Sequence, residues 1–227
     1  MNRITLIAAA AVVVIGAGAY WMTMPATTAQ TDLLPQSVGA ASAQATSELP
    51  SDVQVMEMSQ GSEDAPITVI EYASFTCPHC QSFHENAYGQ LKKNYIDTGK
   101  VKFVMREVYF DRFGLWAGMV ARCDGPEKYF GIVDILFNDQ KKWIGNGDPA
   151  GIADRLAKIG LRAGMSTEKV DACLNDGDKA KAMVAVYQAN AEADDVRGTP
   201  SFVINGEKAP NMNYADFSAL LDKKLSE

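Results

Sequence analysis

A short apolar segment that leads directly into two cysteines limits the folds open to this chain of 227 residues. Residues 67–73 are rich in β-branched and apolar side chains on both alternating faces, apart from Glu71. A strand covered on both faces has this pattern, which is typical of a parallel sheet in an α/β fold. The motif Cys77-Pro78-His79-Cys80 follows this segment closely. The pattern therefore predicts a buried strand that leads to a pair of thiols.

The residues after this motif predict a helix and then a second strand. Apolar side chains recur every four residues at Phe83, Ala87, Leu91 and Tyr95. This spacing indicates one buried helix face, and Gly99 is a natural stop. Residues 101–108 have the composition of the next strand. Reaction sites of open α/β sheets gather at the carboxyl ends of strands, which is where this β–α–β unit places the cysteines.

Most of the remaining chain has helical patterns, and it predicts more helices than one connection between two strands requires. Residues 113–190 carry helical patterns, and we expect roughly four helices because Gly, Pro and Asn clusters interrupt them. The interruptions are at 125–126, 145–149, 160–166 and 175–178. We therefore expect a helical insertion packed beside the sheet.

The end of the chain predicts a hairpin followed by a helix. Residues 201–204 form a short apolar strand pattern, and Asn205-Gly206 is a hairpin-turn signal. Residues 207–209 are then the returning strand. Residues 214–225 are amphipathic and predict a closing helix.

The N-terminus predicts an export segment. Residues 1–24 place Arg3 before an uncharged, mostly apolar run, which is the layout of a signal peptide or a membrane anchor. Both alternatives stay open, and both deliver the rest of the chain outside the cytosol. Residues 25–52 are rich in Ala, Ser, Thr and Gln and predict a flexible linker. The folded part divides into a first half of the sheet fold, the insertion and a second half, at 53–112, 113–190 and 191–227.

Composition and charge exclude one broad class of function. Hydrophobic residues make up 47% of the chain, which suffices for one domain with a sizeable core. The formal net charge is −7, and the sequence has no cluster of Lys or Arg. A nucleic-acid-binding protein normally has a basic face, so we expect no nucleic-acid partner.

The chemistry of the motif follows from its place at the start of a helix. Pro78 suits the first helical turn, where a missing N–H is not needed, so Cys77 stands at the helix N-terminus. Free N–H groups and the helix dipole favour an anion there, which lowers the pKa of the Cys77 thiol. His79 adds a further donor. Cys77 is thus the expected nucleophile of a redox-active pair with Cys80.

Half of a zinc site is the alternative interpretation of the two cysteines. A structural zinc ion needs four ligands. The chain has two histidines, both close to the motif, and no second Cys-x-x-Cys. We therefore expect redox chemistry without a metal.

Two motifs occur together in this chain. Glu71 stands six residues before Cys77 in the first, Ser74-Phe75-Thr76-Cys77-Pro78-His79-Cys80, and the second is Gly198-Thr199-Pro200-Ser201-Phe202-Val203-Ile204-Asn205-Gly206. In combination they resemble the DsbA family of periplasmic thiol–disulfide oxidoreductases. The resemblance covers about Asp64 to the C-terminus and implies an α/β thioredoxin fold with an inserted helical domain. It implies a periplasmic location and no cofactor.

The resemblance also implies roles for single residues. Pro200 would be a cis-proline facing the cysteines, where an ordinary trans proline is the alternative. Thr199 and Pro200 would pair with an extended substrate peptide. Glu71 would be a buried acid beneath the cysteines that relays protons, rather than a partly wet residue. We expect His84, one turn beyond Cys80, to be a plain surface residue.

Cys123 and Cys173 are the remaining cysteines. Both lie in predicted helices, and outside the cytosol a structural disulfide between them is the simplest interpretation. Two free buried thiols or a regulatory redox pair are the alternatives. Some α-proteobacterial-type members of the DsbA family are similar in having such a second pair.

Three functions are compatible with these patterns. The first is a monomeric dithiol oxidase of reduced exported proteins, re-oxidised by a membrane partner of the DsbB type. The second is an isomerase or reductase kept reduced by a partner of the DsbD type. The third is a Cu(I) chaperone that uses Cys77 and Cys80, since soft thiolates suit Cu(I). We expect the oxidase, because residues 25–52 are too short for the dimerisation domain that isomerases of the DsbC type carry.

Overall fold

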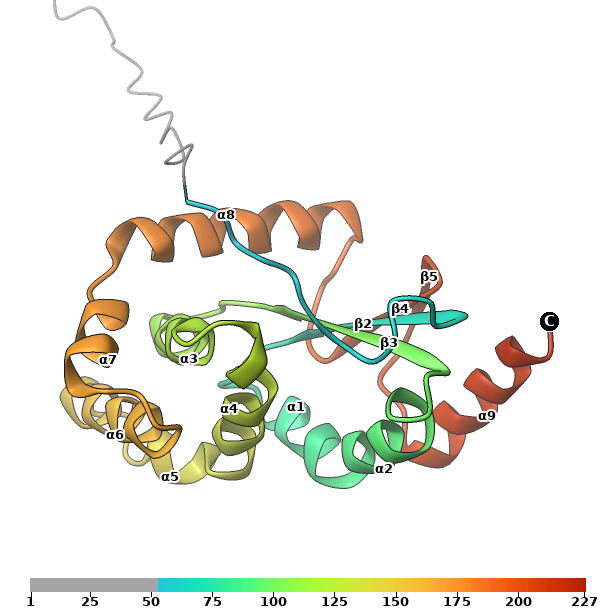
Figure 1. The fold of residues 1–227 in the computed structure, drawn as a ribbon, viewed down its shortest axis with the longest axis horizontal. Helices are drawn as coiled ribbons and strands as arrows, with labels where there is room; N and C mark the ends of the chain where they lie inside the picture. Colours follow the sequence, from blue (N-terminus) through green and yellow to red (C-terminus); the bar gives the residue numbers. More distant parts are fainter. Residues whose placement is uncertain (1–52) are drawn as a thin grey trace, which may run out of the picture. The chain divides into compact units, whose positions relative to one another are not determined.

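A mixed sheet of five strands lies at the centre of the computed structural model, which describes residues 53–227 (Figure 1). In spatial order the strands are β1 (Met58–Gln60), β3 (Val101–Glu107), β2 (Ile67–Ala73), β4 (Ser201–Ile204) and β5 (Glu207–Ala209). Only β2 and β3 pair in parallel; the other neighbours are antiparallel. The predicted parallel pair is present and the predicted C-terminal hairpin is antiparallel, but β1 also pairs with β3 and β4 with β2 in antiparallel fashion. A wholly parallel sheet is therefore wrong, because burial on both faces indicates helical cover and not strand direction.

The N-terminal predictions concern residues that the structure does not describe. The signal or anchor at 1–24 and the linker at 25–52 lie outside the described residues. Within 53–227, none of the helices combines the length and apolarity needed to cross a bilayer.

The predicted crossover from β2 to β3 is a nearly continuous helical rod. It consists of α1 (Pro78–Phe83), the π-helical turn η1 (His84–Tyr88), α2 (Gly89–Leu91) and a second π-helical turn, η2 (Lys92–Ile96). The apolar side chains at the four-residue spacing are all buried. The chain then turns at Gly99, whose φ of +74° favours glycine.

Six helices connect β3 to β4. They are α3 (Arg112–Arg122), α4 (Pro126–Asn138), α5 (Gln140–Ile144), α6 (Pro149–Arg162), α7 (Thr167–Leu174) and α8 (Gly177–Ala193). The predicted interruptions are all present. An additional break at Asp139 separates α4 from α5 and involves no Gly or Pro, which explains why the sequence pattern missed it.

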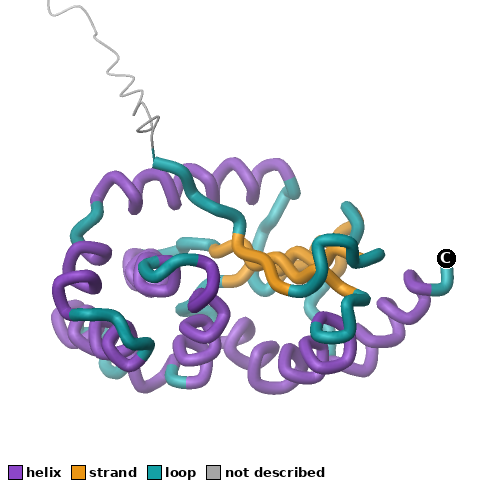
Figure 2. The backbone as a smooth tube through the Cα atoms, viewed as in Figure 1, coloured by secondary structure: helices purple, strands orange, loops and turns teal. Residues whose placement is uncertain are grey.

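Helices cover both faces of the sheet. Helix α8 runs along one face, and α1, α2 and α9 (Tyr214–Leu225) lie along the other (Figure 1, Figure 2). Tyr72 of β2 points to the α8 side, where its hydroxyl donates to the Asn190 carbonyl oxygen at 3.0 Å. Because side chains alternate along a strand, the neighbouring Glu71 points to the α1 side. This alternation places a carboxyl group beneath the first helix.

The C-terminal hairpin and helix match the predicted ranges. Asn205 and Gly206 have φ of +50° and +82°, as a tight hairpin of this type requires. The side chain of Asn213 accepts a hydrogen bond from the Asp216 N–H and caps α9. Phe217 of α9 contacts Phe83 and Phe202, so this helix closes the core under β4.

Candidate active site

The two cysteines of the motif lie at the first turn of α1, directly after β2. Cys77 is the N-cap residue with extended backbone (φ −82°, ψ 120°), and Pro78 opens the helix. Both thiols are free; Cys77 is half-buried, whereas Cys80 is 0% exposed. His79 between them is exposed. One thiol can therefore meet a partner molecule, while the other stays behind it.

The pKa values of the two thiols are displaced in opposite directions. The pKa of Cys77 is lowered to about 5, first by a hydrogen bond from the Cys80 thiol and then by donors from Thr199 and the N–H groups at the helix start. The pKa of Cys80 is raised, mainly by burial and further by its bond to Cys77 and the charge of Glu71. Near neutral pH, Cys77 is thus the thiolate and Cys80 the thiol.

A cis peptide bond stands against Cys77. The Thr199–Pro200 bond is cis, as the resemblance implies. Cys77 Sγ lies 3.4 Å from the carbonyl oxygen of Thr199, to which the protonated thiol donates. The Thr199 hydroxyl is buried and has no hydrogen-bond partner among residues 53–227, so it is available to the thiolate. The geometry brings together the two motifs that lie far apart in the sequence.

Gln140 fixes the backbone beneath the motif, and sequence reasoning missed it. Its side-chain amide donates to the carbonyl oxygens of Phe75 at 2.8 Å and Cys77 at 3.0 Å. The residue is 2% exposed and comes from the short helix α5. Gln81 makes a reciprocal contact, donating to the Phe137 carbonyl oxygen of α4 at 3.1 Å. A single glutamine more than 60 residues from the motif carries no sequence signal for this contact.

Glu71 and His84 form a buried pair below Cys80. Glu71 is 0% exposed, so the expected burial of this acid is confirmed. His84 Nε2 lies 3.0 Å from Glu71 Oε2, and the imidazole is 4% exposed. It stacks on Phe137 with ring centroids 4.1 Å apart.

The prediction that His84 is a surface residue is wrong. A residue four positions after buried Cys80 lies on the same helix face, and this face packs on the sheet and on α4. The signal that could have placed His84 correctly was therefore its spacing from Cys80.

The second cysteine pair is a disulfide. Cys123, at the end of α3, is bonded to Cys173 in α7, with Cα atoms 5.8 Å apart. It links two helices of the insertion and takes no part in the contacts around Cys77.

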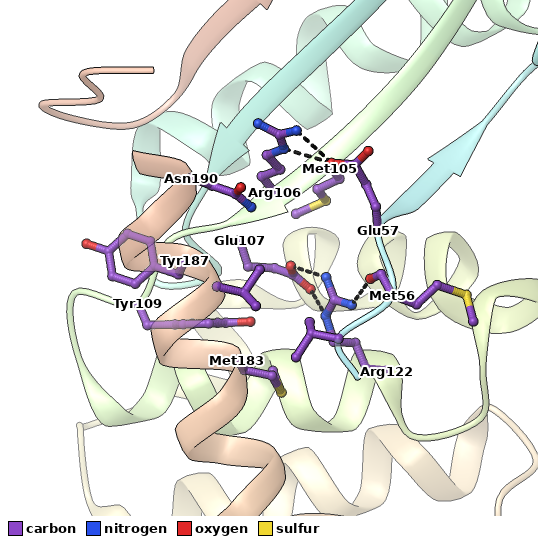
Figure 3. A pocket seen from close by; sticks show the side chains of 12 residues that line it. Met56, Glu57, Met105, Arg106, Glu107, Tyr109, Arg122, Met183, Tyr187 and Asn190 are labelled. Atoms are coloured by element: carbon purple, nitrogen blue, oxygen red, sulfur yellow. Dashed lines mark hydrogen bonds and ion pairs between the residues drawn. The ribbon is translucent and has the colours of Figure 1, made fainter. Parts of the chain in front are cut away.

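A cavity of about 320 Å³ lies between residues 55–57, β3, α3 and α8. Figure 3 shows the ion pair of Arg122 and Glu107 on its wall, with Arg122 also bonded to the Met56 carbonyl oxygen. Neither cysteine of the motif lines this cavity. Among residues 53–227, no group of three or more His, Cys, Asp or Glu side chains is arranged to hold a metal ion.

Comparison with known proteins gives consistent similarities. Residues 53–223 match the family model described as "Thioredoxin". The chain is 34% identical over 172 residues to a Rickettsia bellii protein named "Putative protein-disulfide oxidoreductase". The match covers 75% of this chain and 65% of that protein, so the chain spans slightly less than two thirds of this relative's length.

Solved structures are similar over most of their own length. The crystal structure of Wolbachia pipientis alpha-DsbA1 has a TM-score of 0.69 and 27% identity, and the match covers 77% of this chain and 93% of that one. A protein-disulfide isomerase from Novosphingobium aromaticivorans has a TM-score of 0.69 and 26% identity, with 75% and 98% covered.

Proposed function

This chain belongs to the thioredoxin family, and from that premise we propose that it is a thiol–disulfide oxidoreductase of the DsbA type. The activity we assign is the oxidation of dithiols in exported proteins. The observation that carries the proposal is the asymmetry of the two thiols: a half-exposed Cys77 whose pKa is lowered to about 5, in front of a fully buried Cys80. The similarity to a protein named as a disulfide oxidoreductase supports the same activity.

The oxidation proceeds in two thiol–disulfide exchanges. A substrate thiolate attacks Cys77 Sγ in the Cys77–Cys80 disulfide, which forms a mixed disulfide and releases Cys80 as a thiolate that takes up a proton. A second substrate thiolate then attacks the substrate sulfur bonded to Cys77. The substrate leaves with a new disulfide, and the enzyme keeps both electrons as the Cys77 thiolate and the Cys80 thiol.

The cis-proline loop is the proposed docking edge for the substrate. Thr199 and Pro200 precede β4 and stand against Cys77, whose sulfur is 3.4 Å from the Thr199 carbonyl oxygen. An extended peptide can pair with this backbone strand to strand, which gives affinity for many sequences without reading side chains closely. Reduced, unfolded exported proteins are the substrate class that this edge suits.

The direction of the reaction follows from the stabilised thiolate. A lowered pKa at Cys77 favours the reduced enzyme, and a disulfide whose reduced form is stabilised is an oxidant. We therefore assign the oxidase direction. The periplasmic location that we propose rests instead on the resemblance to DsbA proteins. A membrane oxidase of the DsbB type would remove the electrons, and the enzyme would act as a monomer.

The test is oxidation of a reduced peptide that carries two cysteines. The oxidised wild-type protein should form the peptide disulfide in stoichiometric amounts, and Cys77→Ser should form none. Reduced Cys80→Ser, mixed instead with the peptide in its disulfide form, should stop at a mixed disulfide between Cys77 and the peptide, because no second enzyme thiol can resolve it, and gel electrophoresis detects this adduct. Ser82→Ala, at an exposed position next to the motif, is the matched control.

Alkylation of thiols in cells tests the direction. Cys77 and Cys80 found mostly oxidised would agree with an oxidase, whereas a mostly reduced pair would mean a reductase or isomerase with a DsbD-type partner. Peptide oxidation by Cys77→Ser at the wild-type rate would overturn the assignment of the nucleophile.

A further inference from the structure

Two atoms of the buried pair below Cys80 have no hydrogen-bond partner. Glu71 Oε2 and His84 Nε2 are 3.0 Å apart, but Glu71 Oε1 and His84 Nδ1 are buried and unpaired in the described part of the chain. Buried polar atoms in proteins are almost always hydrogen-bonded, so each exception requires an explanation. Both unpaired atoms are positions at which a proton can be gained or lost.

The exchange reaction requires a proton at the Cys80 sulfur. Attack on Cys77 releases Cys80 as a thiolate, and Cys80 is 0% exposed. Burial raises the pKa of Cys80, and the charge of Glu71 raises it further. A buried thiolate is therefore a poor leaving group unless a proton reaches it during the step.

The surroundings of His84 offer few other titratable groups. Tyr88 of η1 has its ring centroid 4.6 Å from the imidazole, and burial raises the pKa of its phenol. Asp134 of α4 interacts electrostatically with His84, and burial raises its pKa. Cys80 of α1 is the third group. Glu71 and His84 are the directly bonded pair among these groups.

We propose that His84 is a positioning residue for Glu71, the acid to which the family resemblance assigns a proton relay, and that the two side chains share one proton while the Cys77–Cys80 disulfide is closed. This inference rests on the proposed oxidoreductase function. When a substrate thiolate bonds to Cys77, the shared proton passes to the Cys80 thiolate. The pair is left as a carboxylate and a neutral imidazole joined by the Nε2–H···Oε2 hydrogen bond. Re-oxidation runs the transfer in reverse, and solvent restores the proton balance.

The chemistry of the imidazole separates this role from a merely structural one. A glutamine at position 84 can still donate an N–H to Glu71 and fill much of the same space, but it cannot take up a proton. A structural role would therefore be rescued by His84→Gln, whereas a role in proton sharing would not be.

The kinetic test uses single-turnover reduction of the oxidised protein by dithiothreitol, stopped by acid and alkylation, from pH 4.5 to 8.5. The rate constant is expressed per dithiothreitol thiolate. For the wild type it should fall through an inflection as the pair loses its shared proton. His84→Gln should lack this inflection and be slower on the acidic side by roughly tenfold or more. Glu85→Gln, which alters an exposed carboxylate next to His84, is the matched control and should retain the wild-type profile.

A spectroscopic measurement tests the same pair without turnover. The chain has two histidines, so nitrogen NMR of the imidazoles gives two pairs of signals, and the His84→Gln spectrum assigns them. In the oxidised protein, Glu71→Gln should change the titration of His84 and leave that of exposed His79 unchanged.

The outcomes distinguish the two levels of the proposal. A His84→Gln protein with the wild-type pH profile, or a His84 signal indifferent to Glu71→Gln, would overturn the shared proton but not the oxidoreductase. A wild-type disulfide that dithiothreitol does not reduce would overturn the proposed function itself, and the NMR titration would still decide whether the pair shares a proton.

Discussion

The ionisation of Cys77 links the stability of the reduced protein to pH. Its pKa is about 5 in the folded chain, against an ordinary value of 9.0. A depressed pKa contributes stability that is fully present above the unfolded value and is lost as pH falls through the folded value. The free energy of unfolding of the reduced protein should therefore rise between pH 5 and pH 8, relative to that of the oxidised protein.

Urea unfolding of both redox forms at several pH values measures this difference. The oxidised protein has no thiol at Cys77, so it corrects for the groups whose titration does not depend on the redox state. Reduced Cys77→Ser serves as the second control and should lose the pH-dependent difference. A reduced wild type that gains no stability over the oxidised form across this range would contradict the lowered pKa.

Some residues of this site could be predicted from the sequence, and others could not. The identity of Cys77 and Cys80 followed from spacing alone, because their chemistry depends on the local helix start. The positions of Glu71 and of the cis bond at Pro200 needed the family resemblance. The burial of His84 could have been predicted from its four-residue spacing from Cys80. Gln140 depends on packing between helices that are distant in the chain, which neither a motif nor a local period indicates.

For several helices and strands, the local pattern of apolar and turn residues was sufficient to predict where the element begins and ends. The ranges predicted for β2, β4, β5 and α9 agree with the structure. The hairpin turn predicted the direction of β5 relative to β4, but the antiparallel pairings of β1 with β3 and of β4 with β2 were not predicted, since alternation looks the same in parallel and antiparallel pairs. The break at Asp139 was missed as well. Gln140, the first residue of α5 after that break, donates to the Cys77 carbonyl oxygen.

The ion pair of Arg122 and Glu107 joins α3 to β3, and its loss should be costly. The side chains are 7% and 3% exposed, and Arg122 donates to both carboxylate oxygens of Glu107. Removing one partner of a buried pair typically costs about 3–5 kcal/mol, because a buried charge is left behind. We expect Arg122→Met to lower the free energy of unfolding by about this amount. Urea titration of the oxidised protein measures it.

Replacing both partners is the informative control for this pair. In Arg122→Met with Glu107→Leu no buried charge remains, although the Tyr129 hydroxyl loses its bond to Glu107. The double variant should recover a large part of the stability that the single variant loses. If the double variant is less stable than the single one, the buried charge is not the source of the cost.

Two kinds of connection stabilise the folded region: side-chain hydrogen bonds between the motif and the insertion, and a disulfide within the insertion. Gln140 and Gln81 bond the motif to α5 and α4, while the disulfide braces the insertion internally. The first connection bears on the reactive thiols directly. The disulfide links α3 and α7, which do not carry the reactive thiols. Its removal should therefore lower stability without lowering activity.

Cys123 and Cys173 close a loop with a sequence separation of 50 residues. In the chain-entropy model, a cross-link of this span restricts the unfolded chain enough to stabilise the fold by about 4 kcal/mol. We expect Cys123→Ala with Cys173→Ala to lower the free energy of unfolding by about 2–4 kcal/mol. Peptide oxidation should stay at the wild-type rate, because Cys77, Cys80 and their contacts are unchanged. Urea unfolding and the peptide assay on the same preparation separate the two effects. A double variant of wild-type stability and reduced activity would instead make this disulfide a second redox centre.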